Sequence, residues 1–189
     1  MKIKEAGKRV ETKEKYLPTD DEIAAILDNV NERYRALTSL MLHHGLRIGE
    51  AIALERDDVR VEHQPGAPLP RVTVRVKQNA QRISGKGGTY MLVQPPKTKA
   101  GYRDVPIMAA DVPIFLEHLE KYAPTSSTVV QTSEGERSAV LFTVTNAGRM
   151  VMDTSYRSVL ARAKERAGVS PDIDPHTGRN WLITRLAEQ

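Results

Sequence analysis

Two segments of the sequence place an arginine where it could hold a phosphate group. Arg47 follows a glycine in G-L-R-I-G-E-A, at the expected start of a helix, and Glu50 comes three residues later. Arg179 ends the segment H-T-G-R, one helical turn after His176. A guanidinium binds two phosphate oxygens at once, and histidine transfers protons near neutral pH. Taken singly, each segment is as well explained by a surface ion pair or by chance.

A third segment, P-K-T-K-A-G-Y-R-D-V-P, places Lys97 on an expected turn between two strands. A lysine on a turn can reach into a neighbouring groove, where its ammonium can donate a proton to a leaving alkoxide. An ordinary solvated turn lysine is the simpler explanation of this segment alone. The three segments together are much harder to explain by chance.

The charge distribution indicates one surface that faces a polyanion. Residues 71–103 contain eight Lys/Arg and no carboxylate, whereas the whole chain has a net charge of only +4. Such a basic stretch is typical of proteins that bind nucleic acid. A solvated hairpin that lacks acidic residues is the alternative.

The elements that must position these residues follow from apolar spacing and capping signals. Thr19 and Glu22 form a predicted capping box that opens the first helix. Further helices are expected at 31–44, 48–54, 110–122, 154–168 and 175–189, strands at 59–62, 72–76, 90–93 and 102–107, and loops at 84–88 and 124–137. The order predicts an α+β fold: a mostly helical domain with a small antiparallel β-sheet, truncated at its C-terminus. We expect residues 1–16 to be a basic tail or interdomain linker and residues 17–189 to be one incomplete domain.

Composition excludes several classes of protein. The chain has no cysteine, so it has neither a disulfide framework nor a thiolate metal site. Its charged N-terminus is no signal peptide, and no apolar run is long enough to span a membrane. We therefore expect a cytoplasmic protein without a membrane partner.

In this order and spacing, the three segments resemble the catalytic domain of the tyrosine recombinase (phage integrase) family. The resemblance implies DNA integration and site-specific recombination through a phosphotyrosyl intermediate. At the matching positions it implies that Arg47 and Arg179 bind the scissile phosphate, that Lys97 is the general acid, that His176 assists proton transfer and that Glu50 supports Arg47. It implies no metal and no cofactor, because two arginines neutralise the phosphate charge.

The sequence departs from the family pattern in two places. Gly178 and Asn180 stand where the family usually has leucine and histidine, so we expect Arg179 at a helix start. All six tyrosines precede His176, and Trp181 is too near Arg179 to be the family's later tryptophan. We expect Trp181 to pack in the core with Leu182 and Leu186. The nucleophile is then unknown and expected beyond Gln189, and the chain is expected to be a fragment that is inactive alone.

The expected partners are double-stranded DNA and other recombinase protomers. Contacts to DNA phosphates are expected from Arg75, Lys77, Arg82, Lys86, Lys99 and Arg103, besides Lys97. Two other hypotheses remain open. A shortened recombinase could bind DNA and regulate a partner without catalysis. A metal-dependent nuclease would need ligands, for which Asp172, Asp174 and His176 are the candidates, although a loop and a helix cap explain the two aspartates better.

Overall fold

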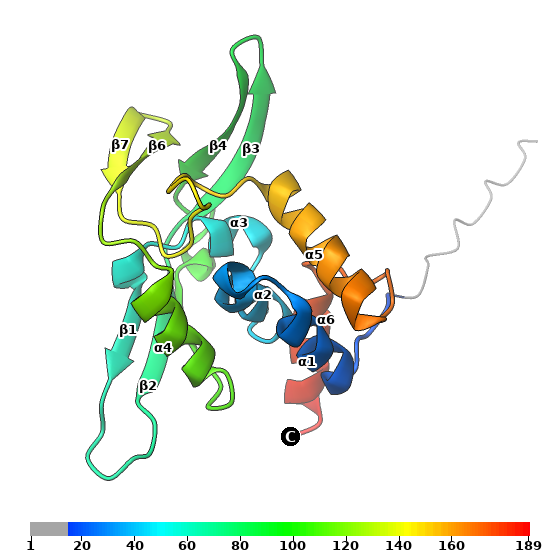
Figure 1. The fold of residues 1–189 in the computed structure, drawn as a ribbon. Helices are drawn as coiled ribbons and strands as arrows, with labels where there is room; N and C mark the ends of the chain where they lie inside the picture. Colours follow the sequence, from blue (N-terminus) through cyan, green and yellow to red (C-terminus); the bar gives the residue numbers. More distant parts are fainter. Residues whose placement is uncertain (1–14) are drawn as a thin grey trace, which may run out of the picture.

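The computed structural model describes residues 15–189 as helices packed beside two small β-sheets (Figure 1). The predicted tail, residues 1–16, lies almost wholly outside the described residues. The α-helices are α1 (Asp20–Asn29), α2 (Arg35–Leu42), α3 (Ile48–Ile52), α4 (Val112–Lys121), α5 (Asp153–Ala167) and α6 (Thr177–Ala187). The strands are β1 (Val59–Glu62), β2 (Arg71–Val76), β3 (Asn79–Gly85), β4 (Gly88–Gln94), β5 (Arg103–Pro106), β6 (Thr128–Thr132) and β7 (Gly135–Ala139), and short 3₁₀ turns are η1 (Glu32–Tyr34), η2 (Arg56–Asp58) and η3 (Lys99–Gly101). The predicted α+β class is confirmed.

The strands form two sheets, where the sequence predicted one. The first is antiparallel, in the order β1-β2-β5, and Val74 of β2 lies opposite both Val59 and Val105. The second has the order β3-β4-β6-β7 and contains a parallel pair, β4 with β6. The prediction of a loop at 124–137 is wrong, because β6 and most of β7 lie there, and the loop predicted at 84–88 shrinks to the turn Lys86-Gly87 between β3 and β4.

The first helix begins as its sequence predicts. The Thr19 hydroxyl accepts a hydrogen bond from the Glu22 N–H at 3.2 Å, and the Thr19 N–H donates to Glu22 Oε2 at 2.9 Å. The helix expected at 31–44 is divided into η1 and α2. Gly45 has φ 67°, a left-handed conformation that L-residues with a Cβ rarely adopt. The chain can therefore turn sharply from α2 into α3.

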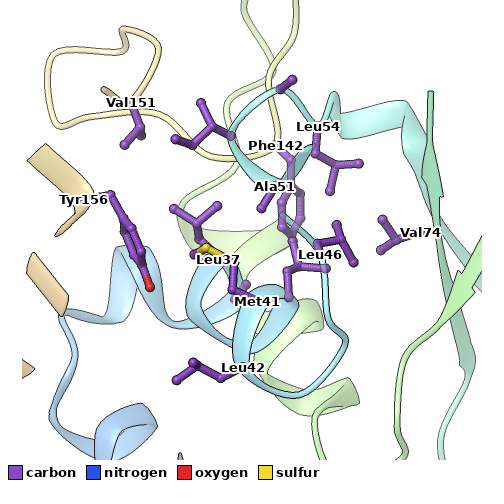
Figure 2. Close-up of a cluster of buried hydrophobic side chains, with 14 of the residues drawn as sticks. Leu37, Met41, Leu42, Leu46, Ala51, Leu54, Val74, Phe142, Val151 and Tyr156 are labelled. Carbon is purple, nitrogen blue, oxygen red and sulfur yellow. The ribbon is translucent and has the colours of Figure 1, made fainter. Parts of the chain in front are cut away.

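Helix α2 is the centre of the hydrophobic core. Every residue from Ala36 to Leu42 is buried, so α2 is covered on all sides. Figure 2 shows side chains from other elements around it, including Val74 of β2, Phe142 and Tyr156 of α5. The buried Tyr156 hydroxyl donates to Thr38 Oγ1 at 3.0 Å, and Thr38 donates to the Tyr34 carbonyl at 2.7 Å. The hydroxyls of Tyr156 and Thr38 are therefore buried in the core with their hydrogen-bonding capacity satisfied.

Helix α6 lies against the C-terminal end of α2 at Gly178. A Cβ at this position would overlap the Met41 carbonyl oxygen and lie 2.6 Å from Leu42 Cα, so only glycine allows this approach. The buried Trp181 secures the same helix, because its indole N–H donates to Asp20 Oδ1 at 2.9 Å. The predicted burial of Trp181 is confirmed, but Leu186 is 63% exposed and not a core residue.

No helix within residues 15–189 combines the length and the apolar character needed to cross a bilayer.

We predict that Gly178→Ala destabilises the protein by about 1–3 kcal/mol, since the added methyl forces α6 away from α2. Alanine would otherwise favour a helix by up to ~1 kcal/mol. Urea unfolding followed by circular dichroism measures the change in the free energy of unfolding.

Gly87→Ala is the matched control, because nothing lies within 4 Å of a Cβ at that turn position. Its unfolding free energy should stay within about 0.5 kcal/mol of the wild-type value. Equal stabilities for Gly178→Ala and the wild type would contradict the close contact between α6 and α2.

Candidate active site

Arg47 lies immediately before α3, at the end of the turn that Gly45 begins. Its backbone is extended, with φ −69° and ψ 150°, and its side chain is 59% exposed. The Arg47 N–H donates to Glu50 Oε2 at 2.8 Å, and the Arg47 guanidinium lies 3.6 Å from Glu50 Oε1. Glu50 therefore fixes the main chain of Arg47 more closely than its side chain.

The main partner of the Glu50 side chain is Arg103 of β5. The Arg103 guanidinium donates to both carboxylate oxygens, at 3.1 Å and 2.8 Å, and Glu50 is only 6% exposed. Burial raises the pKa of Glu50, but the hydrogen bonds from Arg103 and from the Arg47 N–H outweigh it, so the pKa lies below its usual range. Glu50 is therefore ionised at neutral pH and links β5 to the start of α3.

Arg179 lies in the first turn of α6, at the helix start as predicted, and is half-buried. Its Cα lies 3.7 Å from the position of a Cβ on Gly45, so the start of α6 touches the turn that positions Arg47. Burial, and after it the positive charge of Arg47, lower the pKa of Arg179. Among residues 15–189 no carboxylate forms an ion pair with Arg179. The two guanidiniums therefore share a site with excess positive charge.

His176 is the exposed residue at the N-terminus of α6. Asp174 caps this helix, since its Oδ1 accepts from the His176 N–H at 2.7 Å and from the Thr177 N–H at 3.0 Å. These bonds agree with the helix-end role predicted for Asp174, while His176 is the residue directly before α6. Within residues 15–189 no group of three potential ligands lies close enough to hold a metal ion.

One cavity of about 720 Å³ brings these residues together. Arg47, His176 and Arg179 line it, although Arg47 precedes His176 by 129 positions in the sequence. Tyr16 and Asp172 contribute to its wall. The sequence predicted this grouping from motif order, but it did not predict Tyr16, which it placed in the tail.

A second cavity of about 440 Å³ is also lined by Arg47 and brings in Lys97. Lys97 is exposed in the loop between β4 and η3, and Glu50 also lines this cavity. Lys97 forms no ion pair with any carboxylate among residues 15–189. Arg47 thus borders both cavities, and the combined surface suits a phosphate between two arginines with a proton donor beside it.

The other basic residues divide by their partners. Arg75, Lys77 and Arg82 each face a carboxylate: Arg75 Nε lies 3.5 Å from Asp104, Lys77 Nζ 2.9 Å from Asp58, and Arg82 Nε 3.3 Å from Asp153. Lys86, at the tip of the β3–β4 hairpin, and Lys99 have no such partner in the described part of the chain. The DNA contacts of all these residues stay predictions. A contact of Arg103 with DNA would compete with its hydrogen bonds to Glu50.

Two tyrosines bear on the search for a nucleophile. Tyr156 is buried and its pKa is strongly raised by burial, so it cannot reach a phosphate. Tyr16 borders the larger cavity, but its hydroxyl donates to Glu22 Oε1 at 2.7 Å. Neither is placed as an attacking group.

Sequence reasoning missed four amide residues that line the smaller cavity, Gln78, Asn79, Gln81 and Gln94. The last three belong to β3 and β4. The signal that could have found them is the spacing of Asn79 and Gln81, which alternation places on one face of a strand.

Comparison with known proteins identifies relatives for most of the chain. Residues 17–189 match the phage integrase family. The chain is 31% identical over 159 residues to the tyrosine recombinase XerD of Corynebacterium glutamicum, covering 84% of this chain and 41% of that protein. It is 26% identical to a putative prophage phiRv2 integrase of Mycobacterium tuberculosis, covering 86% of this chain and 37% of the relative. The chain thus spans about two fifths of the length of these relatives.

Two solved structures have a similar fold. The Tn1549 transposon integrase in complex with transposon right end DNA has a TM-score of 0.71 at 20% identity, covering 94% of this chain and 55% of that one. The XerA recombinase has a TM-score of 0.61 at 14% identity, covering 90% and 50%.

We predict that Arg103→Ala lowers the free energy of unfolding at pH 7 by about 1–3 kcal/mol, because it leaves the buried Glu50 carboxylate without its main partner. Because the Arg103 side chain is 31% exposed, the loss of unfolding free energy should be smaller than for a fully buried ion pair. Glu50 has a lowered pKa when folded, so its contribution is present above its ordinary value of 4.5 and is lost as the pH falls. Urea unfolding at pH 7 and at pH 4 measures both effects.

Lys121→Ala removes an exposed ion pair with Glu117 and should cost less than about 1 kcal/mol. Adding Glu50→Gln to Arg103→Ala should recover part of the loss, because no unpaired charge is then buried. A loss as small as that of Lys121→Ala would show that Glu50 does not depend on Arg103.

Proposed function

Because this chain belongs to the phage integrase family, we propose that it is the phosphate-binding part of an enzyme that cuts and rejoins DNA in site-specific recombination. Its substrate is double-stranded DNA and its reaction passes through a phosphotyrosyl intermediate. The observation that carries the proposal is the cavity shared by Arg47, Arg179 and His176, with Lys97 across Arg47.

The electrostatics of this cavity support an anionic ligand. Arg179 is half-buried and lacks an acidic partner among residues 15–189. Burial lowers the pKa of Arg179, and the positive charge of Arg47 lowers it further. The guanidiniums of Arg47 and Arg179 repel each other when the site is empty. A phosphate that accepts hydrogen bonds from both offsets this repulsion. The two arginines stabilise the transition state more than the bound phosphate, because the transition-state oxygens carry more negative charge. This difference accelerates the reaction.

Each residue then has a role in strand cleavage. A tyrosine hydroxyl loses its proton to a base as its oxygen bonds to the phosphorus, the bond to the 5′-oxygen breaks, and Lys97 donates a proton to the leaving oxygen. His176 assists proton transfer at the same phosphate, and Glu50 holds the Arg47 main chain at the start of α3. The phosphotyrosyl bond conserves the energy of the phosphodiester, so a second DNA hydroxyl can reseal the strand without ATP.

We assign the nucleophile to a tyrosine outside residues 1–189. Tyr156 is buried, the Tyr16 hydroxyl is bound to Glu22, and no tyrosine follows His176 in the sequence. The same observation favours a second candidate, a DNA-binding or regulatory chain without catalysis of its own. Strand cleavage by a longer chain that includes the tyrosine separates the two.

DNA binding extends beyond the cavity in this proposal. Lys86 and Lys99 are the basic residues best placed to contact phosphates, since neither is neutralised in the described part of the chain. Arg75, Lys77 and Arg82 would first have to exchange a carboxylate for a phosphate. Other recombinase protomers are the expected protein partners on DNA, and the cytoplasm is the expected compartment.

We predict that Arg179→Ala weakens binding of this chain to a DNA duplex roughly tenfold, because a charge-assisted hydrogen bond to phosphate is lost. The slope of log Kd against log salt should fall by about one counterion. Fluorescence anisotropy at several salt concentrations measures both quantities.

Arg162→Ala removes the same charge from an exposed position on α5 and should change neither quantity as much. In a longer chain with the tyrosine, Arg47→Ala should abolish the covalent DNA adduct on a nicked substrate and weaken binding only modestly. Unchanged adduct formation in that variant would refute the role of Arg47.

A further inference from the structure

The β3–β4 hairpin carries three amide side chains on one face, next to the proposed phosphate site. Asn79 pairs directly with Gln94 across the two strands, and Gln81 follows Asn79 by two residues. Neighbouring positions across an antiparallel pair, and alternate positions along a strand, share a face. The residues between them, Ala80 and Val93, are buried on the opposite face. Figure 1 shows the hairpin projecting beyond the helices from its base beside α3.

This amide face borders the phosphate site directly. Asn79, Gln81 and Gln94 line the cavity of about 440 Å³ that Arg47 and Lys97 also line. The contact with α3 is close, because a Cβ at Gly49 would lie 3.1 Å from Asn79 Cγ. Arg47 lines both this cavity and the one that holds the phosphate, so a duplex bound there meets these amides with adjacent nucleotides.

The three amides are available to a ligand. None of them makes a side-chain hydrogen bond within residues 15–189. Their neighbour Gln78 differs, since its amide donates to the Ala53 carbonyl at 2.6 Å and to Glu55 at 3.0 Å. Gln81 is exposed and Asn79 and Gln94 are half-buried, so all three are reachable without unfolding the hairpin.

The chemistry of this face favours bases over phosphates. Arg82, the nearest cation along β3, has its side chain on the opposite face and pairs with Asp153 at 3.3 Å. An amide presents a donor and an acceptor side by side, and this pair matches the N7 acceptor and N6 donor of adenine in the major groove. A neutral amide surface gains little from a phosphate but discriminates between base edges.

We propose that Asn79, Gln81 and Gln94 form a base-reading surface that recognises adenine in the major groove, at base pairs adjacent to the phosphate bound by Arg47 and Arg179. This inference rests on the proposed function, since it needs a DNA duplex in the site. It assigns sequence selectivity to the amide face and non-selective affinity to the basic residues.

The test begins with selection of duplexes from a randomised library by the 189-residue chain. The preferred duplex is then compared with the same duplex carrying 7-deazaadenine at each selected adenine, which removes N7 and leaves base pairing intact. We expect 7-deazaadenine at one position to weaken wild-type binding about tenfold or more. In Gln81→Ala or Gln94→Ala that penalty should fall to about twofold or less, with the salt dependence unchanged.

Gln64→Ala, in the exposed loop between β1 and β2, is the matched control and should keep the full 7-deazaadenine penalty. Circular dichroism verifies that each variant is folded. Salt-dependent binding without any adenine preference, or a penalty that persists in both amide variants, would overturn the inference and leave the proposed function standing. Absence of salt-dependent binding to any duplex would overturn both.

Discussion

The close packing of α6 on the end of α2 is the constraint on which the site depends. Gly178 brings the start of α6 into backbone contact with Met41 and Leu42, and the left-handed Gly45 turns the chain away at the same point. Because both glycines act at one junction, Arg179 and Arg47 emerge beside each other from segments far apart in the sequence. A bulkier residue at position 178 would move α6, and with it one of the two guanidiniums that form the cavity.

Holding two arginines together has an electrostatic cost, and the structure offsets only part of it. The buried Glu50 carries one negative charge, but Arg103 already binds both of its oxygens. Glu50 pairs with Arg103 and Arg47 only, so the charge of Arg179 is not balanced by a carboxylate among residues 15–189 and lies at the larger cavity. This arrangement differs from the structural network of Glu55 and Asp58 with Lys77 and Arg137, in which two acids balance two cations. The imbalance at Arg47 and Arg179 is the physical reason to place a phosphate there.

The sequence predicted those parts of the molecule whose signals are local. The capping box at Thr19, the apolar spacing of the helices and the alternating valines of β2 each depend on near neighbours, and the structure has these elements. It missed β3, β6 and β7 because they lack a regular apolar alternation: β3 has polar or small residues at most positions, and Val129 of β6 is 56% exposed. Their pairing, including the parallel contact of β4 with β6, is set by long-range packing that no short pattern encodes. Motif order predicted that Arg47, Lys97, His176 and Arg179 belong to one site. It could not predict that Glu50 pairs mainly with Arg103, because that pairing depends on the distances between the folded side chains.

The two sheets position different kinds of chemistry around Arg47. The β1-β2-β5 sheet supplies Arg103, which orders Glu50 and so the start of α3. The second sheet supplies a hairpin whose amides, together with Lys97 of the following loop, line a cavity with the same arginine. Affinity for phosphate depends on charge and is insensitive to base sequence, whereas amides contribute little to affinity and much to discrimination. Phosphate binding and base discrimination are therefore carried by different elements. Residues of the hairpin face can change without disturbing the buried ion pair that fixes Arg47.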